Sequence, residues 1–155
     1  LTDPLTGMHN RRFFFRRANE LLRVTTQYHG SPPLSLTLYD LNNLKQINDT
    51  YGYEAGDRAL KEVAAAFRKN YQEGFGVAAR IGGGRFAVAQ HDTLDNAQRT
   101  AQEVRDGLLS VVITDLPVDI SFGTSRFGTN QWADGMDINQ MLGLAEFALN
   151  IHTKG

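Results

Sequence analysis

The sequence contains no cysteine, which excludes disulfides, thiolate metal ligands and cysteine nucleophiles together. Only 4 of its 155 residues are proline, and no apolar run approaches the roughly 18 residues of a membrane-spanning helix. It also has no excess of charge, since 16 basic and 17 acidic residues leave a formal net charge of −1. A chain without a basic excess has no field that steers it onto a nucleic-acid duplex, so we expect no duplex partner.

The residues that are present are typical of one ordinary domain. Hydrophobic residues make up 41% of the 155, which is enough to bury a core without metals or disulfides. No linker, repeat or low-complexity segment divides the chain, so we expect a single domain over residues 1–155. A cysteine-free composition suits the reducing cytoplasm. Because the chain begins with Leu1, we expect it to be a part of a longer protein, in which a membrane anchor would lie outside this sequence.

Hydrophobic periodicity predicts alternating helices and strands. Apolar stripes predict helices over about 11–24, where Asn10 is a candidate N-cap, and over about 55–71, 94–108 and 138–149. Alternation predicts strands over about 34–41, 75–81, 86–88 and 118–122, and the polar segment 42–52 is typical of turns. This order predicts an α+β fold, an α/β sandwich of a sheet with packed helices. The clean alternation further predicts antiparallel pairing and one less-buried sheet face.

Asp40 is the first residue that could carry chemistry, because it stands at the carboxyl end of a predicted strand. Ligand sites of open sheets lie beyond strand ends, and a carboxylate there suits a hard cation such as Mg²⁺. The alternative is an Asp that ends the strand and caps the following turn.

Two further segments have both a functional and a structural interpretation. In the polar run 42–49, Lys45 could contact a phosphate and Asn48 could contact a base edge, or the run could be a solvated turn. The glycines of Gly82-Gly83-Gly84-Arg85 could approach a phosphate closely, or they could simply form a tight β-hairpin.

The order of the motifs resembles the GGDEF family, the diguanylate cyclases and their relatives. The matching segments, in chain order, are Asp3-Pro4-Leu5-Thr6-Gly7-Met8-His9-Asn10-Arg11-Arg12, 40–52, Ala55-Gly56-Asp57, Arg80-Ile81-Gly82-Gly83, Ser121-Phe122-Gly123 and Ala145-Glu146-Phe147-Ala148-Leu149. The resemblance implies a nucleotide-cyclase palm-like fold, with a central, mostly antiparallel, five-stranded sheet flanked by helices. It also implies a domain of a multidomain signalling protein, which in active relatives pairs with a second copy and condenses two GTP into cyclic di-GMP and pyrophosphate.

The resemblance also implies roles for individual residues. Asp40 and the backbone carbonyl of Leu41 correspond to metal ligands, and Leu44 and Lys45 belong to the phosphate-facing segment. A further pair, Asn48 and Asp57, corresponds to the residues that read the guanine edge, where polar pairing discriminates strongly against other bases.

The signature hairpin departs from the family pattern of two glycines, two acids and a phenylalanine. Gly84 stands where the resemblance implies a metal-binding acid, and Arg85 stands where it implies a catalytic Glu. Asn42 replaces a frequent second Asp. A guanidinium beside a cation site opposes metal binding, so we expect the Mg²⁺ site to be weak or lost, and Mg²⁺ to be needed only if nucleotide binds productively.

The sequence therefore predicts a degenerate GGDEF domain of cyclic di-GMP signalling. In this hypothesis the domain makes no cyclic di-GMP and acts as a regulatory, GTP-binding or dimerisation module, with Arg85 contributing positive charge to the phosphates. The alternative is an active or weakly active diguanylate cyclase. A third hypothesis is a pure interaction module that links a sensor to an output domain, such as a neighbouring EAL-type phosphodiesterase, or that forms a homodimer.

Overall fold

The computed structural model describes residues 1–28, 30, 32–72, 74–127 and 137–151, and the backbone of residues 152–154. In chain order, the elements are α1 (Arg11–Gln27), β1 (Leu34–Leu41), α2 (Leu44–Tyr51), α3 (Tyr53–Asn70), β2 (Gly76–Gly82), β3 (Arg85–His91), α4 (Leu94–Leu109), β4 (Val112–Ile113), β5 (Leu116–Pro117), β6 (Ile120–Phe127) and α5 (Ile138–Lys154). No helix of the described segments is long and apolar enough to cross a bilayer.

The main sheet has the strand order β2-β3-β1-β6, and each neighbouring pair is antiparallel. The predicted α+β fold, an antiparallel sheet flanked by helices, is confirmed. The strand number differs from the expected five, because the described residues place four strands in this sheet. The short strands β4 and β5 form a separate two-stranded ribbon after α4.

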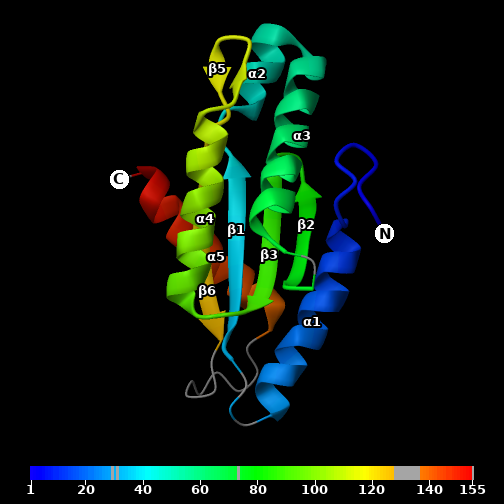
Figure 1. The fold of residues 1–155 in the computed structure, drawn as a ribbon, viewed down its shortest axis with the longest axis vertical. Helices are drawn as coiled ribbons and strands as arrows, with labels where there is room; N and C mark the ends of the chain where they lie inside the picture. The colour runs from blue at the N-terminus through cyan, green and yellow to red at the C-terminus, as the bar shows by residue number, and fades with distance from the viewer. Residues whose placement is uncertain (29, 31, 73, 128–136, 155) are drawn as a thin grey trace.

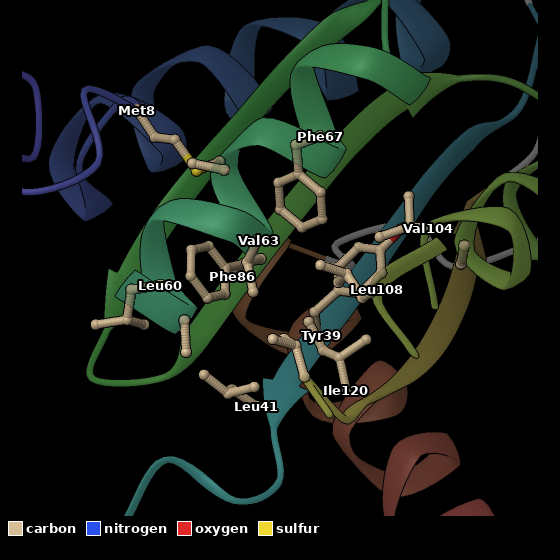
Figure 2. Close-up of a cluster of buried hydrophobic side chains, with 14 of the residues drawn as sticks. Met8, Tyr39, Leu41, Leu60, Val63, Phe67, Phe86, Val104, Leu108 and Ile120 are labelled. Atoms are coloured by element: carbon tan, nitrogen blue, oxygen red, sulfur yellow. The ribbon is translucent and has the colours of Figure 1, made fainter. Parts of the chain in front are cut away.

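Helices cover both faces of the sheet, as Figure 1 shows. Helices α3 and α4 pack on one face, where Tyr39, Phe67 and Phe86 belong to one hydrophobic cluster (Figure 2). Helices α1 and α5 pack on the opposite face, where a second cluster includes Leu36 and Met141. The expectation of one less-buried face is therefore wrong, because even the small polar side chains of β1 are buried under helices.

Segment 42–52 forms a helix where the sequence predicted turns. Helix α2 spans Leu44–Tyr51, and Gly52, at φ 91°, separates it from α3. The segment is rich in Asn, Asp and Thr, which are weak helix formers. The helix is stabilised by packing, because Ile47 is fully buried in the cluster that α3 lines.

The N-terminal turn is tied to the sheet by charge. Asp3 accepts hydrogen bonds from the backbone N–H and the hydroxyl of Thr6, and its carboxylate lies 3.2 Å from the guanidinium of Arg80 on β2. Burial alone would raise the pKa of Asp3, but the Thr6 hydrogen bonds and Arg80 outweigh burial and lower it. Asn10 caps α1 as predicted, since its side chain accepts from the backbone N–H of Phe13 at 2.9 Å.

Helix α5 lies unusually close to β6 because of Gly123. A Cβ atom at this position would lie 2.1 Å from the carbonyl oxygen of Ala145 and 2.3 Å from the backbone nitrogen of Leu149. The hydroxyl of Ser125 also donates to the carbonyl of Met141 at 2.8 Å. These contacts hold the middle of α5, including Glu146, against the sheet.

Candidate functional site

The predicted site begins where β1 ends and β3 begins. The antiparallel register pairs Asp40 with Arg85 on β3 and with Ser121 on β6. Leu41 continues β1, and its backbone N–H donates to the carbonyl of Gly84 at 2.9 Å. The fold thus brings together four of the residues that the sequence singled out, Asp40, Leu41, Gly84 and Arg85.

In the hairpin between β2 and β3, the glycines that the backbone turn requires differ from the glycine that stands at the predicted site. Gly82 and Gly83 have φ values of 154° and 50°, which disfavour residues with a side chain. Gly84 has no such positive φ, and a Cβ there would lie 3.1 Å from the Cβ of Leu41 and 3.5 Å from its carbonyl oxygen. A side chain at position 84 would therefore stand beside the Leu41 carbonyl.

Arg85 pairs with two carboxylates through the same nitrogen, Nη2. This atom lies 3.0 Å from Oε1 of Glu146 on α5 and 3.9 Å from Oδ2 of Asp40. The Arg85 and Asp40 side chains are each 36% exposed and that of Glu146 is 46% exposed, so the cluster is open to solutes. Three charged groups from β1, β3 and α5 thus meet at one edge of the sheet, and their net charge is negative.

The electrostatics of Asp40 reflect these neighbours. Burial raises the pKa of Asp40, Arg85 opposes this rise, and the negative charge of Glu146 adds to it. Among the described residues, no group of three or more His, Cys, Asp or Glu side chains is arranged to hold a metal ion.

Helices α2 and α3 pack closely at Asn48, one of the two predicted guanine-facing residues, and Gly56, the residue before the other. Oδ1 of Asn48 lies only 1.7 Å from where a Cβ of Gly56 would be, so the missing side chain makes room for this amide. The same Oδ1 is buried and has no hydrogen-bond partner within the described part of the chain. Asp57 follows Gly56 directly and is partly exposed. The unpaired amide oxygen of Asn48 therefore lies at Gly56, one residue before Asp57 in the sequence.

Of the three residues that were predicted to face phosphates, Leu44 and Lys45 lie on the first turn of α2 and Arg85 lies on β3. The Leu44 side chain would be 3.4 Å from a Cβ at Gly84, which links α2 to the hairpin. Lys45 follows and is exposed. Asn42, before this helix, is held by Asp119 and Ser121 through hydrogen bonds of 3.1 and 2.8 Å. It is therefore engaged with the loop before β6 and with that strand.

Glu146 is the residue of this site that sequence reasoning missed. It belongs to a segment, Ala145–Leu149, that matched the family, but the acid was not singled out. Its position over Arg85 depends on the packing of α5 against the sheet, which no local pattern reveals.

Comparison with known proteins identifies the class. Residues 1–153 match the family described as diguanylate cyclase, GGDEF domain, and the chain belongs to this GGDEF family. It is 38% identical to the response regulator PleD of Caulobacter vibrioides over 106 residues. This alignment covers 68% of this chain and 23% of PleD. It is 30% identical over 149 residues to the diguanylate cyclase VdcA of Vibrio cholerae, covering 94% of this chain and 42% of VdcA.

The fold is also that of solved GGDEF structures. The diguanylate cyclase SiaD of Pseudomonas aeruginosa, solved with its activator SiaC, superimposes with a TM-score of 0.84 at 30% identity over 99% of this chain and 58% of SiaD. The expected cyclase palm-like fold is thereby confirmed. The chain spans less than half the length of the curated relatives PleD and VdcA.

Proposed function

We propose that this chain is a GGDEF domain of cyclic di-GMP signalling that binds a guanine nucleotide as a regulatory module and does not condense GTP. The observation that carries the proposal is the ion pairing of Arg85 with Asp40 and Glu146. The guanidinium lies at the edge where the family resemblance implies carboxylates, and Gly84 supplies no side chain beside it.

The donor set near Asp40 does not fit Mg²⁺. This ion requires octahedral oxygen ligands and is usually held by one or two carboxylates with substrate phosphates and water. Here Asp40 and the Leu41 carbonyl are the expected ligands, and a guanidinium lies 3.9 Å from the Asp40 carboxylate. Phosphoryl transfer depends on metal charge near the phosphates, so a site that does not hold the ion would not support cyclase activity.

The two residues that the family resemblance assigns to guanine recognition, Asn48 and Asp57, are in contrast both present. The buried, unpaired Oδ1 of Asn48 is an acceptor that a guanine N–H group would satisfy, and an unsatisfied buried acceptor is costly. Asp57 would accept from the N1 and N2 hydrogens of the same edge, as the family resemblance implies. Lys45 and Arg85 would then supply positive charge to the phosphates.

The regulatory role of such a module depends on its neighbours. Because the chain spans less than half of PleD and VdcA, we expect flanking domains, such as a sensor or an EAL-type domain. A homodimer is the other expected assembly. We place the domain in the cytoplasm, where GTP is available, with any membrane anchor in the remainder of the protein.

A weakly active cyclase is the second candidate function. It is favoured by the retained Asp40 and Leu41 at the strand end and by similarity to VdcA and SiaD, which are both named as diguanylate cyclases.

Titration with GTP in the presence of EDTA or Mg²⁺, followed by product analysis, tests the proposal. We expect saturable GTP binding that persists in EDTA, weaker binding by Asn48→Ala, and no cyclic di-GMP. Steady formation of cyclic di-GMP with Mg²⁺ or Mn²⁺ would establish the second candidate. Absence of GTP binding under both conditions would leave only an interaction role.

A further inference from the structure

The closest charged partner of Arg85 is Glu146, which comes from α5 and is remote in sequence. The Nη2–Oε1 distance of 3.0 Å is a hydrogen-bonding distance, whereas the 3.9 Å to Asp40 Oδ2 is only an ion-pair distance. The guanidinium is therefore directed mainly at Glu146.

A phosphate that approaches Arg85 must compete with these carboxylates, because it needs the same N–H donors. Asp40 is the less able of the two to move away, since it lies in β1 between β3 and β6 and its side chain is short. Glu146 is the more exposed, and its longer side chain can turn into solvent, where its charge is hydrated. A phosphate that binds Arg85 would therefore displace Glu146 from the guanidinium more easily than it would displace Asp40.

We infer that Glu146 is a positioning residue that holds Arg85 in the empty domain and competes with the nucleotide phosphates for its guanidinium. The inference rests on the proposed function, because it assigns the regulation of the same nucleotide site. It predicts that Glu146 weakens binding of phosphate-bearing ligands and has no influence on binding of the guanine part alone.

The test is a set of titrations of the intact chain in EDTA with GTP, guanosine and inorganic tripolyphosphate. The variants are Glu146→Gln, Arg85→Ala and the double substitution. Exposed ion pairs are weak, so we expect Glu146→Gln to bind GTP and tripolyphosphate about three- to fivefold more tightly than the natural chain. Guanosine affinity should not change. The gain should vanish in the Arg85→Ala background and should shrink as salt is added.

Glu103→Gln on α4 is the matched control, since it removes the same charge from an exposed position on the opposite face of the sheet. A gain that it shares would indicate net charge rather than competition and would overturn the inference.

The outcomes separate the inference from the proposed function. Unchanged or weaker tripolyphosphate binding by Glu146→Gln overturns the inference, even if the natural chain binds GTP well. Tighter tripolyphosphate binding that requires Arg85 supports it, even if no GTP binding is found and the proposed function fails. Tighter binding that persists without Arg85 also overturns it.

Discussion

Restoring the two acids of the hairpin should restore a divalent-cation site. The perturbation is Gly84→Asp combined with Arg85→Glu. The backbone tolerates it, because Gly84 has no positive φ, although a Cβ 3.1 Å from that of Leu41 requires a shift of a few tenths of an ångström. The new carboxylate at position 84 would lie beside the Leu41 carbonyl, which is the second expected ligand.

The magnitude follows from the charge that is removed. A unit charge and a divalent cation about 4 Å apart interact by about 8 kcal/mol at an effective dielectric constant near 20, and by about 2 kcal/mol in bulk water. Because Arg85 is 36% exposed, solvent screening reduces its repulsion of a cation at Asp40 to about 1–2 kcal/mol. Arg85→Ala alone should therefore raise Mn²⁺ affinity about five- to thirtyfold, and the double substitution, which adds two carboxylates, more than about a hundredfold.

The assay is a Mn²⁺ titration that is monitored by calorimetry or electron paramagnetic resonance. Thermal unfolding of each variant verifies that it folds. Arg99→Glu, which reverses an exposed charge on α4, is the matched control and should leave Mn²⁺ affinity nearly unchanged. If the natural chain binds Mn²⁺ as tightly as the double variant does, Arg85 does not obstruct the site and the reasoning is refuted.

Three other substitutions test the Asn48–Gly56 contact, the N-terminal turn at Asp3 and the packing of α5 on Gly123. A Gly→Ala substitution usually stabilises a helix. Here Gly56→Ala should lower GTP affinity at least about tenfold in a binding assay, because its Cβ would displace the Asn48 amide, whose oxygen lies 1.7 Å from the Cβ position. Unchanged affinity would exclude Asn48 from guanine recognition. Asp3→Asn should lower the free energy of unfolding at neutral pH by about 1–2 kcal/mol. The lowered pKa of Asp3 gives stability that is present above pH 3.8 and is lost as pH falls through the folded-state pKa, so the natural chain and the variant should converge in acid denaturation; a constant difference would contradict this. Gly123→Ala should cost more than about 3 kcal/mol in chemical denaturation, because its Cβ would meet the Ala145 carbonyl at 2.1 Å, and a loss below about 1 kcal/mol would show that α5 moves freely.

The local pattern of hydrophobic residues was sufficient to predict most helices and strands of the fold. The predicted helices over 11–24 and 55–71 correspond to α1 and α3, and the strand over 34–41 is β1. The prediction for segment 42–52 was wrong, because burial of Ile47 overrides weak intrinsic helix propensity. The ribbon of β4 and β5 was also missed, since strands of two residues have no detectable periodicity.

The site was predictable where a strand register determines it. Once β1 and β3 pair, Asp40 and Arg85 must be neighbours. The contribution of Glu146 was not predictable, because it depends on how closely α5 approaches β6, and that distance is controlled by the missing side chain at Gly123. The roles of Asn48 and Asp57 in binding guanine stay predictions.

The turn of the β2–β3 hairpin has a consequence for how such domains diverge. The residues that bend the chain, Gly82 and Gly83, are distinct from the two positions that face the ligand edge. Side chains at positions 84 and 85 can therefore change without altering the two glycines that make the turn, and the chain is two substitutions from a signature with both acids.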